Sequence, residues 1–120
     1  MYVFSFEKLE VWQEASDLVT KLYRTTESFP IEEKFGLTSQ IRRASVSIAS
    51  NLAEGTSRIT NKDKAHFTTM AYSSTMELLN QLIVSRNLNF LSEENYINFR
   101  KSISKIFNML NALRKSQLNS

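Results

Sequence analysis

The sequence SEENYINFRKSISKIFNMLNAL, residues 92–113, decides the fold. Its apolar side chains recur at alternating intervals of three and four residues, which is the heptad pattern of a helix that packs along one side of a bundle. Ser92 is a typical helix N-cap, and Glu93 and Glu94 follow it where the positive end of the helix dipole favours acidic side chains. We therefore predict a long amphipathic helix over residues 93–116. Its apolar seam consists of Tyr96, Phe99, Ile103, Ile106, Leu110 and Leu113.

The first part of the chain shows the same helical period over residues 5–28. Ser5 is the expected N-cap, and the helix should end before Phe29, because a residue that precedes proline disfavours the α conformation. Two adjacent apolar stripes give this helix a wide buried face. One stripe holds Leu9, Trp12, Ser16, Val19 and Tyr23, and the other holds Val11, Ala15, Leu18 and Leu22.

Two further helices are predicted over residues 38–55 and 61–89. Gly55 suits a left-handed C-terminal cap for the former, and the Thr60 hydroxyl, with Asp63 three residues later, resembles a capping box for the latter. The helix at 38–55 is rich in small side chains, which let a neighbouring helix approach closely. These are Ala44, Ser45, Ser47, Ala49, Ser50 and Ala53.

Four helices with short connections and no strand alternation predict an all-α, antiparallel up-down-up-down four-helix bundle in a single domain of 120 residues. Two Gly and one Pro are too few for the many tight turns of a sandwich or barrel. The predicted core consists of Trp12, Ile41, Ile48, Leu78, Leu82, Phe99, Ile103, Ile106 and Leu110.

The composition disfavours most catalytic and metal chemistry. The chain has no Cys and one His, so it lacks thiolates and the paired Glu-x-x-His motifs of di-metal bundles. His66 is a more typical surface residue than a ligand, and Glu54, Asp63 and Glu77 have no nucleophile-and-base partner. We expect a protein that is not an enzyme and has no cofactor or metal.

The charge is unevenly distributed. Residues 1–57 carry six Lys or Arg and eight Asp or Glu, a net charge of −2, whereas residues 58–120 carry nine and four, a net charge of +5. No acidic residue follows Glu94, and the basic side chains of the last helix fall largely opposite its seam, with no aromatic residue between them. Such a face either keeps the helix solvated or binds phosphate. The absence of acidic residues after Glu94 favours the second interpretation, binding of nucleic acid. Its residues are Arg100, Lys101, Lys105, Arg114 and Lys115.

Two other properties follow from the pattern. The wide apolar face of the first helix and the small residues of the second exceed what one bundle core needs, so we expect self-association. The chain has neither a secretory signal nor a run long and apolar enough to cross a membrane, which favours the cytoplasm. Residues 47–67 imitate a helix-turn-helix DNA reader, but the following helix is much longer than a recognition helix.

Four strings carry a family resemblance: FEKLEVWQEA at 6–15, TESFP at 26–30, GLTSQIRRASVSIASNLAEG at 36–55, and F-x-x-x-A-x-x-S-x-x-E at 67–77. Together they resemble the 23S rRNA intervening-sequence proteins. Leu52 stands where that family usually has Ile, and Ser73 where it often has Gly.

The resemblance implies a bacterial protein, a four-helix bundle and a homopentamer with a central channel. It also implies kinship with the accessory protein of diversity-generating retroelements, which works with nucleic acid and a reverse transcriptase. The family supplies no catalytic residues, and its motif positions serve packing between helices or between subunits equally well. These positions are Gln40, Arg42, Arg43, Asn51, Glu54 and Gly55.

The sequence thus favours a non-enzymatic oligomeric bundle that binds nucleic acid, RNA before DNA, through basic faces. A protein-interaction scaffold without nucleic-acid binding is the alternative, and a helix-turn-helix DNA binder is a weaker one. A reverse transcriptase becomes an expected partner if the protein belongs to a retroelement.

Overall fold

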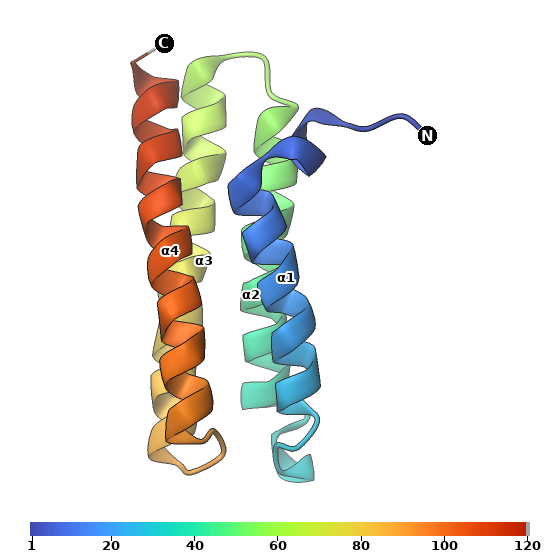
Figure 1. Ribbon diagram of the computed structural model, residues 1–120, viewed down its shortest axis with the longest axis vertical. Helices are drawn as coiled ribbons and strands as arrows, with labels where there is room; N and C mark the ends of the chain where they lie inside the picture. Colours follow the sequence, from blue (N-terminus) through green and yellow to red (C-terminus); the bar gives the residue numbers. More distant parts are fainter. Residues whose placement is uncertain (120) are drawn as a thin grey trace.

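The computed structural model describes residues 1–119 and places them in an antiparallel bundle of 45 × 30 × 22 Å (Figure 1). Successive helices run in opposite directions, so the predicted all-α four-helix bundle is confirmed. Short 3-10 helices, η1 (Ser5–Lys8) and η2 (Ile31–Glu33), precede two of the α-helices. The four α-helices are α1 (Glu10–Thr26), α2 (Leu37–Thr56), α3 (Asn61–Asn87) and α4 (Glu93–Leu118).

Side-chain caps fix the starts of α3 and α4 as the sequence predicts. The Thr60 hydroxyl accepts a hydrogen bond from the backbone N–H of Asp63 at 3.1 Å, and the Ser92 hydroxyl accepts one from Asn95 at the same distance. Each cap satisfies a backbone donor that the first helical turn leaves without a partner. Asn89 in the connection adopts φ 64°, a left-handed conformation that asparagine tolerates better than most residues, and α3 ends at Asn87.

The start of α1 differs from the prediction. Residues 5–8 form the 3-10 turn, Leu9 is extended, and α1 begins only at Glu10. Glu7 accounts for the break: its carboxylate accepts the Phe4 N–H at 2.9 Å, and its carbonyl accepts Gln13 Nε2 at 2.8 Å. These local bonds hold the chain in a tight turn, so Ser5 is not the N-cap of a continuous helix.

The core is largely the predicted one. Eight of the nine predicted core residues are buried, and only Trp12 is half-buried, with its ring edge-on to Phe6 at 5.0 Å between centroids. One stripe of α1 lies wholly in the core, whereas the stripe through Trp12 and Val19 is half-buried and Tyr23 is exposed. The fully buried stripe is Val11, Ala15, Leu18 and Leu22.

The small residues of α2 are used within the chain. Ser47 and Ser74 share a hydrogen bond of 2.9 Å between α2 and α3. Gly55 is not a left-handed cap: it has no positive φ, and α2 continues through it to Thr56. A Cβ at Gly55 would lie only 2.9 Å from Cβ of Phe67, so glycine is required here for close approach to α3.

We predict that Gly55→Ala destabilises the protein. In a free helix the change would raise stability by about 1 kcal/mol, but overpacking costs about 1–3 kcal/mol, and Phe67 Cβ is fixed to its backbone. Thermal unfolding should show a net loss of about 1 kcal/mol. Ser50→Ala, at an exposed position of the same helix, is the matched control and should leave the midpoint unchanged or slightly higher. A higher midpoint for Gly55→Ala would contradict the close approach.

Candidate nucleic-acid interface

The five basic residues predicted on the last helix are all exposed on α4, but they face different neighbours. Lys105 points towards α1, where its Nζ lies 2.7 Å from Oε1 of Glu14. The hydrogen bond and the charge of Glu14 raise the pKa of Lys105. Lys105 therefore does have a compensating acid, contrary to the prediction, because its partner comes from another helix.

Arg100 and Arg114 lie on the α3 side of α4. Arg114 Nε donates to the Thr69 hydroxyl at 2.8 Å, and Arg100 donates to the Tyr96 hydroxyl. Among residues 1–119 neither arginine forms an ion pair, and the same holds for Lys101 and Lys115. We call these four side chains the α4 basic face: Arg100, Lys101, Arg114 and Lys115.

A groove between α3 and α4 carries aromatic rings between the two arginines. Tyr72 and Phe107 are half-buried, with ring centroids 5.2 Å apart and planes inclined by 44°. A hollow of about 390 Å³ lies on the Arg100 side of this pair, and one of about 310 Å³ on the Arg114 side. The prediction that no aromatic residue lies among the basic ones is thus wrong. Phe107 of α4 and Tyr72 of α3 lie between Arg100 and Arg114.

Arg42 of the family motif binds α1. Its Nε donates to the Thr26 hydroxyl at 3.0 Å, and Nη2 donates to the Tyr23 carbonyl at 3.1 Å. The guanidinium also lies 4.5 Å from the centroid of the Tyr23 ring. Thr26 is buried, and its own hydroxyl donates to the Leu22 carbonyl at 2.7 Å. Arg42 therefore ties α2 to the C-terminal turn of α1.

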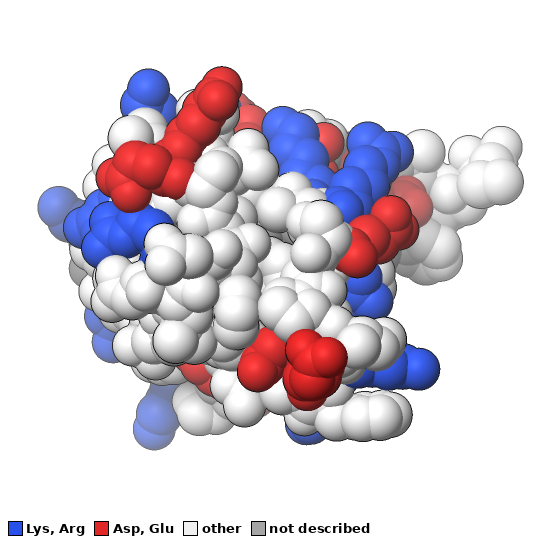
Figure 2. Space-filling view, turned by 90° about the horizontal axis from the view of Figure 1, so that it is seen from below, with Lys and Arg blue, Asp and Glu red and all other residues white. Residues whose placement is uncertain are grey.

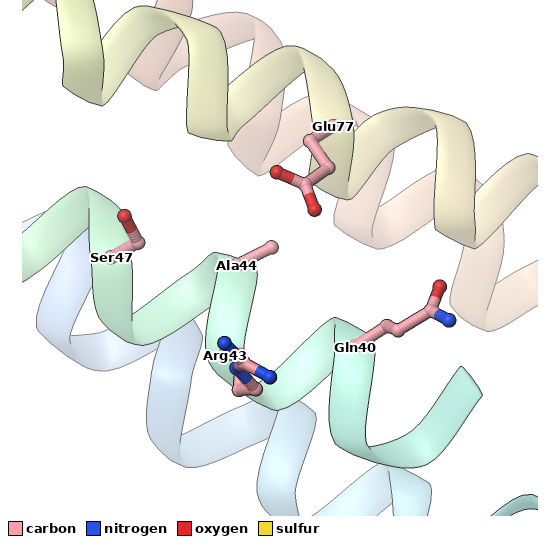
Figure 3. Close-up of a pocket in the computed structure, with 5 residues that line it drawn as sticks. All are labelled: Gln40, Arg43, Ala44, Ser47 and Glu77. Atoms are coloured by element: carbon pink, nitrogen blue, oxygen red, sulfur yellow. The ribbon is translucent and has the colours of Figure 1, made fainter. Parts of the chain in front are cut away.

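The other motif residues lie along the α2–α3 contact. Gln40 and Arg43 line a cleft of about 320 Å³ that Glu77 of α3 closes from the opposite side (Figure 3). Asn51 Nδ2 donates to the Ser47 carbonyl at 2.9 Å and to its hydroxyl at 3.1 Å. Glu54 is exposed near the end of α2, and Gly55 contacts Phe67.

The remaining candidates are not brought together. His66 is exposed, with its ring edge-on to Phe67 at 6.0 Å. Within residues 1–119 no three His, Cys, Asp or Glu side chains lie close enough to hold a metal ion. Tyr72 and Phe107 are the site residues that sequence reasoning missed, and the spacing of aromatics on α3 and α4 was the available signal.

Two arrangements of helices bear on the alternatives. α2 and α3 are antiparallel neighbours, as the contacts of Ser47 with Ser74 and of Gly55 with Phe67 require, rather than the crossed pair of a helix-turn-helix. None of the helices described here is long and apolar enough to cross a membrane.

Comparison with known proteins identifies the family. The model of the 23S rRNA-intervening sequence protein family matches residues 7–112. The chain belongs to this family. Its fold is similar to the crystal structure of a protein of unknown function from the S23 ribosomal protein family of Bacteroides thetaiotaomicron, with a TM-score of 0.81 and 17% sequence identity. The match covers 88% of this chain and 95% of that one. The comparison with curated proteins gives no match.

We predict that Arg42→Ala lowers the free energy of unfolding by about 2 kcal/mol, because the buried Thr26 hydroxyl and a helix-end carbonyl lose a charged donor. Arg43→Ala is the matched control: it removes the same side chain one residue along, at an exposed position, and should cost less than about 0.5 kcal/mol. Urea denaturation measures both. An equal loss of unfolding free energy in the two variants would contradict the structural role of Arg42.

Proposed function

We propose that this member of the intervening-sequence family is a non-enzymatic helical module that binds RNA through the α4 basic face and the adjoining α3–α4 groove. One observation supports this most directly. Arg100 and Arg114 lie on either side of the Tyr72–Phe107 pair, and none of the three nearest carboxylates in sequence, Glu77, Glu93 or Glu94, pairs with either arginine. Unpaired guanidinium groups beside aromatic rings are the elements that single-stranded nucleic acid requires.

The arrangement assigns a role to each part of the surface. Arg100 and Arg114 are 14 positions apart on α4, which separates them by about 21 Å along the helix axis. Lys101 follows Arg100 directly in the sequence, and Lys115 follows Arg114, so the cations form two pairs. Each pair can neutralise phosphates of a different part of the RNA backbone. Tyr72 and Phe107 lie between the pairs and, being half-buried, offer aromatic surface on which bases can stack.

The end of the bundle is less suited to phosphate than the side of α4. Figure 2 views the end at which the α1–α2 and α3–α4 connections lie, and shows an uncharged centre with both acidic and basic groups around it. Carboxylates near the connections offset the cations there, and Arg86 pairs with Glu93 at 3.9 Å, whereas the α4 basic face has no carboxylate partner among residues 1–119. The acidic groups near the two connections are Glu27, Glu32, Glu33, Glu93 and Glu94.

We predict that changing the α4 basic face to Gln (R100Q, K101Q, R114Q, K115Q) weakens RNA binding at least tenfold. Filter binding at several salt concentrations, with single-stranded RNA and duplex DNA, measures the effect. Counterion release gives a slope of about 0.7 per phosphate contact on single strands, so the variant should lose up to about 3 from the slope of log K against log salt.

A control variant with the same change in net charge is K8Q, R24Q, K34Q, K62Q. These four residues are exposed and lie outside α4. The control variant should retain most of the affinity and of the salt slope. Wild-type protein without salt-sensitive binding, or two variants that bind equally well, would contradict the proposal and favour the protein-interaction scaffold. Preference for one duplex sequence would revive the helix-turn-helix alternative.

We also propose self-association, and the N-terminal arm supports it. Tyr2, Val3 and Phe4 are 75%, 49% and 58% exposed, and the arm leaves the bundle at its N-terminal end (Figure 1). The Tyr2 and Phe4 rings contact each other edge-on, with 4.9 Å between their centroids, but both side chains stay exposed to solvent. A contiguous apolar segment of this kind is typical of a protein contact. The family resemblance implies five copies.

We predict that Y2S, V3S, F4S together lower the mass of the assembly at micromolar concentration, because the arm loses its apolar surface. Size-exclusion chromatography with light scattering measures the mass. The matched control, I31S, F35S, I59S, changes three other exposed apolar residues and should leave the mass unchanged. A monomeric wild type, or an arm variant of unaltered mass, would exclude this contact.

A further inference from the structure

The α2–α3 cleft carries opposite charges on its two walls. Gln40, Arg43 and Ser47 line it from α2, over the methyl group of Ala44, and the Glu77 carboxylate points into it from α3 (Figure 3). Its volume of about 320 Å³ is sufficient for a small planar molecule. One wall thus presents an acceptor-only group and the other a donor-only group.

The charged groups of the cleft are exposed and have no ion-pair partner among residues 1–119. Among the described residues the Glu77 carboxylate accepts one bond, from Gln81 Nε2 at 3.2 Å, and pairs with no cation. Arg43 likewise has no ion-pair partner there. Gln81 is only 5% exposed and holds the Glu77 carboxylate from one turn along the same helix.

Glu77 is also isolated along its helix. From residue 65 to residue 85 it is the only Asp, Glu, Lys or Arg. A single carboxylate in this otherwise uncharged stretch of α3, beside a surface proposed to bind RNA, repels phosphate and so works against binding. A carboxylate in this place can instead recognise a base, because it can accept two donors from the edge of a base.

We infer that the cleft binds a guanine base, with Glu77 accepting from N1–H and the N2 amine and Arg43 donating to O6 and N7. Guanine is the only one of the four RNA bases that presents two adjacent donors on one edge and two adjacent acceptors on the next. Gln40 and Ser47 add polar contacts at the two ends of the cleft. The inference rests on the proposed RNA binding when the guanine belongs to a strand, and is independent of it when the guanine belongs to a free nucleotide.

The cleft and the α3–α4 groove are compatible with one strand. They flank the same helix, whose diameter with side chains is about 10 Å. Ser73 and Asn80 are exposed on α3 and uncharged, so a phosphate backbone that crosses this helix meets little repulsion beyond that of Glu77. A strand held by the α4 basic face can therefore place a base in the cleft.

The test compares labelled ten-residue oligouridine RNAs with a central guanine, adenine or inosine, by fluorescence anisotropy with the intact protein. We expect the guanine strand to bind about tenfold more tightly than the adenine strand, which is within the range of one bidentate pair. Inosine lacks the N2 amine and should lose most of this preference. A second titration uses guanosine and adenosine monophosphates separately, and shows whether the cleft binds a free nucleotide or only a base within a strand.

Two variants assign the effect. E77Q should abolish the guanine preference, and the adenine strand should bind as tightly as before or slightly more tightly, because one carboxylate that repels phosphate is lost. R43Q should reduce the preference as well. E54Q is the matched control, because it neutralises an exposed carboxylate at the end of α2 outside the cleft, and should keep the preference. Circular dichroism confirms that each variant is folded.

The outcomes separate the two proposals. Equal affinity for guanine and adenine strands, with binding that still depends on the α4 basic face, overturns the guanine site and leaves RNA binding in place. A guanine preference that survives E77Q also overturns it. Failure of every strand to bind overturns the proposed function; the guanine site then stands only if guanosine monophosphate binds more tightly than adenosine monophosphate and E77Q removes the difference.

Discussion

Close contact between α2 and α3 is the constraint on which the other features depend. Gly55 lets the backbone of α2 approach Phe67, and the hydroxyls of Ser47 and Ser74 hydrogen-bond directly between the helices. At these two points the helices lie too close for large side chains between them. The longer polar side chains of the two helices are therefore displaced to its outer edge, where Gln40, Arg43 and Glu77 surround the cleft. The short residues that join the helices thus lie directly beside the cleft.

Much of the fold follows from local sequence, because heptad spacing and caps act within a few residues. Ser92 and Thr60 cap the helices that they precede, and the seam of α4 is buried. The failures involve partners that a local pattern does not contain. Glycine after an apolar run is typical of a C-cap, yet Gly55 is helical because Phe67, twelve residues later, packs against it. The break at Leu9 depends on hydrogen bonds of one glutamate side chain and its carbonyl, which spacing alone does not reveal.

The candidate sites are less predictable than the fold for the same reason. A projection of one helix places the basic residues of α4 correctly on its exposed side, but Glu14, 91 residues before Lys105, pairs with that lysine. Tyr72 and Phe107 likewise meet only because α3 and α4 are antiparallel. The motif QIRR shows the limit clearly: its two adjacent arginines look equivalent in sequence, yet Arg42 binds α1 and Arg43 lines the cleft.

The two exposed surfaces call for partners of different chemistry. A protein that covered the α4 basic face would have to supply a carboxylate for each cation or bear the cost of desolvating it, whereas RNA supplies a phosphate at every nucleotide. The arm of Tyr2, Val3 and Phe4 carries no charge, and burial of its apolar surface against another chain is favourable by itself. If copies associate through the arm as proposed, each copy adds another basic face to the assembly. Linked weak contacts would then give a higher effective affinity for one RNA than a single bundle has.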